Sequence, residues 1–489
     1  EVRETHISWA LISEEYVYKI KKPLQFPFLD YSTLEKRKYY LEKEWELNRR
    51  FAPEIYLEVL KIVQEKKGIS VRKLSEKGEG REYLLKMRRI PDSRFLSAQL
   101  NSLLPAEMKE IGQRIGRFFL DLPRPEEGAC YGSMEQVRKN MISNLEEIRS
   151  FVPAYMAQKL FDHLYLQTAS FLDSKTALLE ERLKEGFIKD GHGDLRLEHV
   201  YWEDHHFGLI DCIEFNPAFR INDVISEIAF LSMELDQKGH ISLSDALMEG
   251  FFEIFPQESG KRLLNLYRLY RALVRYKVTL LLLGEKILTP EEKKKKEEDL
   301  SRLADLAHGY SWNLISPQVL VICGLMGSGK STLAKELARY YPLVHLNTDS
   351  LRKKITRTPV NKKVKVPYNT GIYTRKRRLQ IYGAMKDEAS RIRSLQRMVL
   401  LDGSFSQKEY WEEIQKEFSP LVIYCHAPRE ILIQRLQQRW QGSSVSDGRA
   451  ELLKHQEEEA QFPPSHLQID TSLPLKDNLE QIITFLDQF

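Results

Sequence analysis

Short apolar runs alternate with amphipathic helical stretches over the last third of the chain. Four of these runs are strand-like: Val319–Cys323, Leu343–Leu346, Val399–Asp402 and Leu421–Cys425. Strands that alternate with helices in this way form parallel sheets. We therefore predict an α/β domain with a parallel sheet over residues 311–489.

The first 310 residues show a different pattern. Trp9–Ile12 and Tyr16–Ile20 are β-prone runs separated by a short turn, and Leu34–Phe51 has helical spacing. Further on, amphipathic helices dominate, with the longest expected over Ala106–Leu120, Met134–Phe151 and Ala154–Arg182. We predict an α+β domain over residues 1–310. The boundary is placed in the polar, proline-containing segment 311–318.

Composition narrows the class of protein only slightly. A hydrophobic content of 42% and a charged content of 29% are typical of globular proteins, and a net charge of +4 on 489 residues does not by itself indicate nucleic-acid binding. Four scattered cysteines without a C-x-x-C pair suggest neither a disulfide framework nor a zinc site. The longest apolar run, Val278–Leu283, is too short to span a membrane, and no signal peptide is visible. We expect a cytoplasmic protein, and whether a segment precedes Glu1 is left open.

A glycine-rich loop follows the first strand of the C-terminal domain and precedes a helix. Its sequence, Gly324-Leu-Met-Gly-Ser-Gly-Lys-Ser331, fits G-x-x-x-x-G-K-S. The glycines allow backbone N–H groups to turn around phosphate oxygens, Lys330 reaches the β- and γ-phosphates, and Ser331 holds Mg²⁺. The sequence therefore predicts ATP and Mg²⁺ as ligands. The predicted binding residues are Gly324, Gly327, Ser328, Gly329, Lys330, Ser331 and Thr332.

Acidic residues follow two further strands of this domain. Asp349 lies just beyond the second strand, at the edge where open α/β sheets bind ligands, and Arg352 follows three residues later. We predict that Asp349 accepts the proton of an acceptor hydroxyl and that Arg352 binds a phosphate or carboxylate of the acceptor. The alternative role for Asp349 is to cap the next helix. Asp402 ends the third strand and is predicted to order Mg²⁺ through water.

Positive charge is concentrated beyond Asp349. From Arg352 to Arg378 there are eleven Lys and Arg residues and no Asp or Glu. This pattern predicts either a lid over polyphosphate or a groove for an anionic substrate, while a solvated helix face is the alternative for its outer residues. Further on, Arg435 and Arg439 are spaced as neighbours on a helix. They are predicted to be lid arginines that stabilise the transferring phosphoryl group, or else to make structural ion pairs.

This half resembles the P-loop kinases that include chloramphenicol phosphotransferase, zeta toxin and polynucleotide 5′-kinase. The resemblance is carried by GLMGSGKST, by the D-x-x-R of Asp349 and Arg352, and by LLDGSF. It implies an ATP-dependent kinase with an alcohol group as acceptor.

A second constellation lies in the N-terminal half. His192-Gly193-Asp194 precedes a strand pair that ends at Asp211, and phosphoryl transfer requires one carboxylate near the acceptor and another on Mg²⁺. Upstream, Lys19 lies on a strand where it could contact the α- and β-phosphates. Glu44, or alternatively Glu42, lies on the helix that follows and could pair with Lys19.

These residues resemble the aminoglycoside phosphotransferase-like branch of the protein-kinase-like fold, whose loop reads HGDLxxxN. The resemblance implies that Asp194 is the catalytic aspartate, Asp211 a metal ligand and Asp223 a structural aspartate supporting the loop. Two features depart from the family. The metal-binding Asn is replaced by His199, whose neutral imidazole suits Mg²⁺ poorly, and no glycine-rich loop precedes Lys19.

The chain as a whole resembles bacterial two-domain proteins described as bifunctional aminoglycoside phosphotransferase-like/ATP-binding proteins. We expect a phosphotransferase that moves the γ-phosphate of ATP to a hydroxyl of a small molecule, nucleotide or RNA, with two nucleotide sites. One alternative is a non-catalytic N-terminal module serving a single C-terminal kinase. The other is an ATPase switch without an acceptor. The acceptor, a shared substrate and the oligomeric state are left open.

Overall fold

The computed structural model describes every residue except 27–28, 67, 126–129, 204, 286–287, 317, 360–366, 368 and 442–447. Contacts between residues divide the chain into two compact units. The first comprises Glu1–Ser143 with Leu172–Gly260, and the second comprises Asn144–Phe171 with Lys261–Phe489. The predicted domains, 1–310 and 311–489, stay a prediction.

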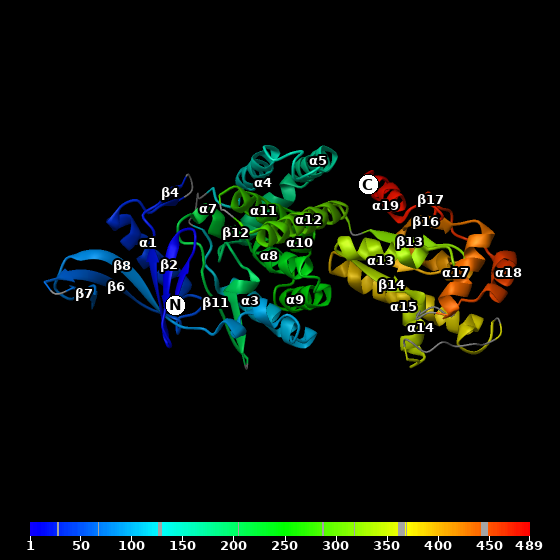
Figure 1. Ribbon diagram of the computed structural model, residues 1–489, viewed down its shortest axis with the longest axis horizontal. Helices are drawn as coiled ribbons and strands as arrows, with labels where there is room; N and C mark the ends of the chain where they lie inside the picture. Colours follow the sequence, from blue (N-terminus) through cyan, green and yellow to red (C-terminus); the bar gives the residue numbers. More distant parts are fainter. Residues whose placement is uncertain are drawn as a thin grey trace. The chain divides into compact units, whose positions relative to one another are not determined.

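Six antiparallel strands form the main sheet of the first unit, in the order β1-β2-β3-β8-β6-β7 (Figure 1). They are β1 (Val2–Glu4), β2 (Ser8–Ile12), β3 (Tyr16–Lys21), β6 (Tyr56–Glu65), β7 (Gly68–Lys73) and β8 (Gly80–Arg88). Helix α1 (Leu34–Asn48) begins at Thr33, whose hydroxyl accepts the Lys36 N–H. Its buried Leu41 packs in one cluster with the sheet residues Tyr56 and Leu85, which places α1 against the sheet.

Helices make up most of the rest of the first unit. The two that pack most closely are α3 (Pro105–Asp121) and α9 (Ile241–Ile254). Their close approach requires glycine, because a Cβ on Gly112 would lie 2.1 Å from the carbonyl oxygen of Leu247. The other helices within this unit are α2 (Leu96–Gln99), α6 (Thr176–Glu185), α7 (Pro217–Arg220) and α8 (Val224–Gln237). Its short strand pairs are β4 (Gln25–Phe26) with β5 (Leu29–Asp30), β10 (Val200–Glu203) with β11 (His206–Leu209), and β9 (Ile188–Asp190) with β12 (Ile221–Asp223).

Several helices carry the chain from one unit to the other or lie at the start of the second. They are α4 (Met134–Arg149), α5 (Gln158–Ser174), α10 (Glu258–Lys261), α11 (Leu264–Glu285) and α12 (Pro290–Ser311). Helix α12 begins with a capping box in which Thr289 and Glu292 satisfy each other's backbone N–H groups. The single helix predicted over Ala154–Arg182 is wrong. The chain leaves helical geometry at Lys175, so α5 and α6 are separate helices.

Five parallel strands form the sheet of the second unit, in the order β14-β15-β13-β16-β17. Their bounds are β13 (Val319–Cys323), β14 (Leu343–Asn347), β15 (Met398–Asp402), β16 (Leu421–His426) and β17 (Leu467–Asp470). The helices are α13 (Lys330–Tyr340), α14 (Thr348–Ile355), α15 (Arg375–Ser394), α16 (Lys408–Phe418), α17 (Arg429–Gln441), α18 (Ala450–Glu459) and α19 (Leu475–Leu486). The predicted fold class, α+β followed by α/β with a parallel sheet, is confirmed, and β17 is a strand that the sequence pattern did not indicate.

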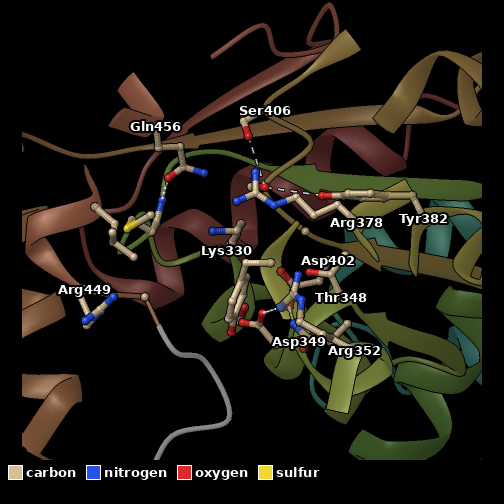
Figure 2. A pocket seen from close by; sticks show the side chains of 18 of the residues that line it. Lys330, Thr348, Asp349, Arg352, Arg378, Tyr382, Asp402, Ser406, Arg449 and Gln456 are labelled. Carbon is tan, nitrogen blue, oxygen red and sulfur yellow. Dashed lines mark hydrogen bonds and ion pairs between the residues drawn. The ribbon is translucent and has the colours of Figure 1, made fainter. Parts of the chain in front are cut away.

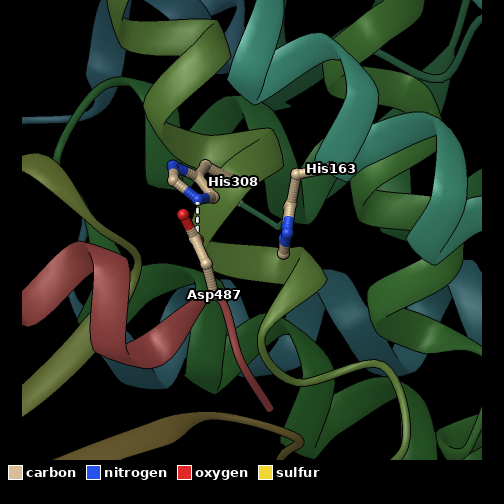
Figure 3. Close-up of side chains that lie close together, drawn as sticks. All are labelled: His163, His308 and Asp487. Carbon is tan, nitrogen blue, oxygen red and sulfur yellow. Dashed lines mark hydrogen bonds and ion pairs between the residues drawn. The ribbon is translucent and has the colours of Figure 1, made fainter.

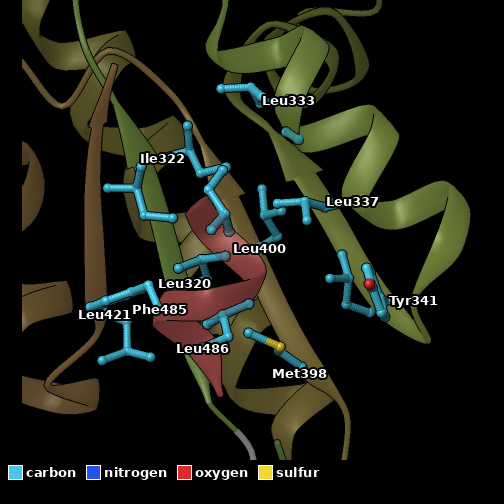
Figure 4. Close-up of a cluster of buried hydrophobic side chains, with 14 of the residues drawn as sticks. Leu320, Ile322, Leu333, Leu337, Tyr341, Met398, Leu400, Leu421, Phe485 and Leu486 are labelled. Carbon is cyan, nitrogen blue, oxygen red and sulfur yellow. The ribbon is translucent and has the colours of Figure 1, made fainter. Parts of the chain in front are cut away.

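Alternate residues of β13 point to opposite faces of this sheet. Leu320 and Ile322 pack with residues of α13 and α19, as Figure 4 shows, whereas Val319 and Val321 pack with residues of α15 and α16. All four are buried. Because both faces are covered, the sheet is open to ligands at the carboxyl ends of its strands.

Within the part of the chain that the structure describes, no helix is long and apolar enough to cross a membrane. Cys130, Cys212, Cys323 and Cys425 are free thiols.

Candidate functional site

The loop after β13 has the backbone geometry that phosphate binding requires. Gly324, Gly327 and Gly329 have φ angles of +143°, +82° and +79°, which residues other than glycine rarely adopt. A Cβ on Gly324 would also lie 2.2 Å from the carbonyl oxygen of Cys425. The loop therefore needs glycine both for its conformation and for its close approach to β16. Helix α13 starts directly after it, at Lys330.

Asp402 lies at the end of β15 and is fully buried. Its Oδ2 accepts hydrogen bonds from Asn347 Nδ2 at 2.6 Å and from His345 Nε2 at 3.1 Å. Its Oδ1 is buried and has no hydrogen-bond partner of normal geometry among the described residues, although the Ser331 hydroxyl is near enough to help lower the pKa of the carboxyl. Burial works against ionisation, but the His345 hydrogen bond and the charge of Lys330 outweigh it and lower the pKa of Asp402. A buried, ionised carboxylate with an open oxygen, close to Ser331, fits a hard cation such as Mg²⁺.

Asp349 and Arg352 lie on α14, just beyond β14, and form an ion pair. The helix is capped by Asn347, whose Oδ1 accepts the Ser350 N–H at 3.0 Å. The capping role considered for Asp349 is therefore wrong, because Asn347 performs it. The guanidinium of Arg352 is buried and lies 4.5 Å from the ring centre of Tyr373. This stacking fixes the arginine and, through the ion pair, orients the Asp349 carboxylate.

One pocket brings these groups together (Figure 2). Phosphate-loop and α13 residues line one part of it, and residues of α14, α15 and α18 line another. Its cationic residues outnumber its acidic ones. The charged lining residues are Lys330, Asp349, Arg352, Arg378, Asp402 and Arg449. Tyr373, Tyr382 and Gln456 supply further polar groups at the wall. The predicted Lys330, Ser331, Asp349, Arg352 and Asp402 therefore share a single cavity.

Of the two predicted lid arginines, the structure describes the side chain of Arg435 but not that of Arg439. Arg435 of α17 donates to the Oγ1 and the carbonyl oxygen of Thr471, at 2.9 and 2.6 Å, and also lies 3.4 Å from the Gly327 carbonyl. It therefore ties α17 to the phosphate loop and to the segment after β17. The side chain of Arg439 lies outside the described residues, as do Lys362, Lys363 and Lys365 of the basic run. The lid role stays a prediction.

A second constellation is assembled in the first unit. Lys19 of β3 lies with its Nζ 2.8 Å from Glu44 Oε1 and 2.7 Å from Asp211 Oδ1. Glu42 instead faces Lys38, at 3.8 Å. Although burial opposes the charge of Lys19, Asp211 and Glu44 raise the pKa of its ammonium group. Partial burial opposes ionisation of Asp211, whose side chain is 46% exposed, but the pairing with Lys19 lowers its pKa. The three groups therefore carry their charges at neutral pH.

A further buried lysine belongs to this network, and sequence analysis missed it. Lys21 is fully buried, and its Nζ lies 2.7 Å from Glu44 Oε2 and also binds Glu214 and Tyr31. Residues two apart on a strand share a face, so the spacing of Lys19 and Lys21 was the available signal. Nothing local in the sequence indicated that Glu214 would form an ion pair with Lys21.

The loop around Asp194 is organised by two histidines. His192 is buried, donates from Nε2 to the carbonyl oxygen of Ile210 at 2.8 Å, and accepts the Asp194 N–H at Nδ1. Burial and the neighbouring His199 lower the pKa of His192 to about 4, so it is neutral. His199 Nδ1 bonds the backbone oxygen of Asp194 at 2.8 Å, and its Nε2 lies 3.7 Å from Asp211 Oδ2.

Asp223 was expected to support the loop around Asp194, but its carboxylate binds groups outside that loop. Its carboxylate pairs with the buried Arg182, at 2.6 and 2.8 Å, and caps α8 by accepting the Ile225 N–H. The carboxylate that bonds the loop itself is that of Glu227, which accepts the Gly193 N–H at 2.8 Å.

Residues 319–463 match a family model described as an AAA domain, which confirms the P-loop domain predicted for the C-terminal part. Two proteins, one of Mycobacterium tuberculosis and one of Mycobacterium bovis, both described as uncharacterized, are each 26% identical to the chain over 460 residues. These matches cover 92% of this chain and 88% of theirs.

Solved structures are similar to each part of the chain. A gluconokinase from Sinorhizobium meliloti is 18% identical, with 35% of this chain and 93% of that chain covered and a TM-score of 0.27. A choline/ethanolamine kinase family protein from Mesorhizobium loti is 13% identical, with 62% and 86% covered and a TM-score of 0.38. At these values the likeness gives no basis for assigning a substrate.

Proposed function

We propose that the chain is an ATP-dependent phosphotransferase and that transfer takes place in the pocket of the second unit (Figure 2). The observation that carries this proposal is the buried, unpartnered Oδ1 of Asp402 in the same cavity as Lys330 and Ser331. A carboxylate oxygen left open in this way costs folding free energy unless a ligand uses it.

The phosphate loop and Lys330 would bind the phosphates of ATP, while Ser331 and Asp402 would hold Mg²⁺, directly or through water. Bound Mg²⁺ neutralises charge on the β- and γ-phosphates. Asp349 would accept the proton of the acceptor hydroxyl as its oxygen bonds to the γ-phosphorus and the bond from that phosphorus to the bridging oxygen breaks, releasing ADP. Arg352 holds the Asp349 carboxylate in position for this step.

The charges of the pocket support an acceptor that carries an anionic group. Besides Lys330 and Asp402, which the proposal assigns to MgATP, and the ion pair of Arg352 with Asp349, the lining holds two more arginines. They are Arg378 and Arg449, and Arg449 also lies 3.7 Å from the exposed Glu451. Arginine is well suited to binding carboxylate or phosphate. Sugar acids, sugar phosphates and nucleotides should therefore be phosphorylated faster than neutral polyols of the same size. Equal rates for charged and neutral acceptors would rule out this assignment of the acceptor.

The nucleotide site is tested by binding. Lys330→Ala should weaken binding of MgATP by tenfold or more, measured by calorimetry, because it removes the cation beside the phosphates. Lys335→Ala is the matched control, since Lys335 is exposed on the same helix. Equal affinity in both variants would contradict the proposed site.

A second nucleotide site in the first unit, around Lys19, Asp194 and Asp211, is part of the proposal, and a non-catalytic module is the competing candidate. One observation favours the module. Asp211 Oδ1 is bound by Lys19 at 2.7 Å, and Oδ2 faces His199 at 3.7 Å, so both oxygens of the expected metal ligand face side-chain nitrogens. Mg²⁺ bound at Oδ1 would have to displace Lys19, at the cost of a short ion pair whose lysine is largely buried and whose aspartate is 46% exposed.

A further inference from the structure

Two histidines and an aspartate of the second unit converge at a point that the proposed reaction does not use. They are His163 of α5, His308 of α12, and Asp487 directly after α19 (Figure 3). One potential ligand atom from each residue can be chosen so that all three atoms lie within 4.8 Å of one another. None of the three lines the pocket around Lys330.

The cluster is largely buried and its groups face one another. His308 Nε2 lies 2.5 Å from Asp487 Oδ1, and Trp312 Nε1 donates to the same oxygen at 3.0 Å. His163 Nε2 lies 2.9 Å from the hydroxyl of Ser311. Among the described residues, Lys159 also approaches the cluster, with its Nζ 3.9 Å from Asp487 Oδ2. Lys159 is mostly exposed and can turn away into water without leaving a buried charge.

We propose that His163, His308 and Asp487 bind one zinc ion or a similar borderline divalent cation. Two imidazole nitrogens and one carboxylate oxygen are a common zinc ligand set, and a water molecule can take the fourth tetrahedral position. Tetrahedral ligands at about 2.0–2.1 Å from zinc are about 3.4 Å apart. Closing the observed 4.8 Å spread to this value requires movements of about 1 Å, which side-chain rotation can supply. The same set suits Mg²⁺ poorly, so this ion is distinct from the one proposed for ATP.

Burial favours the metal-binding form of His163. Burial is the main effect on His163 and lowers its pKa, with the charge of Asp487 opposing it and that of His308 adding to it. The ring is therefore neutral at pH 7, and neutral imidazole is the form that binds metals. An ion here would join α5 and α12 to the end of α19, whose Phe485 and Leu486 form part of the core beneath the sheet.

The experiment uses the full chain without an affinity tag, treated with chelator and then given Zn²⁺. Wild type should retain one zinc per chain after gel filtration, and its unfolding midpoint should rise by about 5–10 °C when free zinc is a hundredfold above its dissociation constant. His163→Gln should retain no zinc and show no rise, although its His308–Asp487 hydrogen bond remains. His455→Gln, an exposed histidine on α18, is the matched control and should behave as wild type.

Two further measurements keep the test decisive. His163→Cys should restore zinc binding, because thiolate is a zinc ligand, and this result would separate lost ligation from lost packing. Cobalt bound by wild type should give the strong visible absorption of a tetrahedral site. Zinc retention by His163→Gln equal to that of wild type, or no retention by wild type, would overturn the proposal and leave the cluster as a hydrogen-bonded link between helices.

Discussion

Replacing Lys21 with Met should strongly destabilise the first unit. Lys21 is fully buried and lies between the carboxylates of Glu44 and Glu214. Together with Lys19 and Asp211, the network has two cations and three anions. Removing Lys21 leaves the buried carboxylates of Glu44 and Glu214, with the half-exposed Asp211, facing a single ammonium group. Methionine fills a similar volume, so the loss is mainly electrostatic.

The expected size follows from this burial. Breaking a buried ion pair by removing one partner costs about 3–5 kcal/mol, because the remaining charge is left uncompensated. Lys22 provides the matched control. It is the next residue in the chain, and it pairs with Glu4, which is 65% exposed. The Lys22 side chain is only 12% exposed, but its removal leaves Glu4 in water rather than an uncompensated buried charge. Pairs with a solvated partner contribute about 0–1 kcal/mol, so Lys22→Met should cost much less than Lys21→Met.

The assay is urea unfolding followed both by fluorescence and by hydrogen exchange of the first unit, because a chain with two units need not unfold in one step. Lys21→Met should lower the free energy of unfolding of that unit by about 3–5 kcal/mol, and adding Glu214→Gln should recover part of the loss. A cost for Lys21→Met equal to that of Lys22→Met would refute the electrostatic reasoning.

Three further predictions concern packing, pH and catalysis. Gly112→Ala should destabilise the first unit by about 1–3 kcal/mol in urea unfolding, because its Cβ would lie 2.1 Å from the Leu247 oxygen. Gly383→Ala, with no atom within 4 Å, should stabilise by up to about 1 kcal/mol, and the reverse order would contradict the packing argument. Burial opposes ionisation of Asp190, but its two arginine partners lower its pKa. The stabilisation of the folded state by the Asp190 ion pairs is therefore present above the unfolded-state pKa of about 3.9, and it is lost as the pH falls below that value through the lower folded-state pKa. The stability gap between wild type and Asp190→Asn should narrow from pH 7 to pH 3, and a constant gap would show that the ion pairs contribute nothing. Asp349→Asn should lower the rate of phosphoryl transfer by about 10²–10⁴-fold while changing the MgATP dissociation constant less than twofold. Equal losses of transfer rate and of MgATP affinity would argue against a role of Asp349 as the base.

The fold of the second unit could be predicted because its signals are local. A strand buried on both faces is a continuous apolar run, and the glycine-rich loop has a fixed spacing, so β13, Lys330 and Ser331 were apparent from sequence. Strand β17 lacked such a run and was missed. The break between α5 and α6 was also missed, because no glycine or proline interrupts the helical pattern at Lys175.

Partners distant in sequence could not be predicted in the same way. Asn347 and Asp349 are both suitable helix caps, and only the backbone geometry at the end of β14 decides that Asn347 is used. Glu227 and Asp223 lie four residues apart, and which one reaches the Gly193 N–H depends on how α8 packs. The candidate site residues, whose roles stay predictions, could therefore be proposed from motifs, whereas the residues that hold them in place had to be observed.

The central claim is that the pocket around Lys330 transfers phosphate to an acceptor. The most direct test is transfer of γ-labelled phosphate from ATP into cell extract, separated into small metabolites and RNA, with wild type beside Lys330→Ala and Asp194→Asn. We predict a labelled product that Lys330→Ala abolishes. Loss of a second product with Asp194→Asn would show that the first unit also transfers, and unchanged labelling would identify it as a module. No labelled product with wild type, or the same product with Lys330→Ala, would contradict the account.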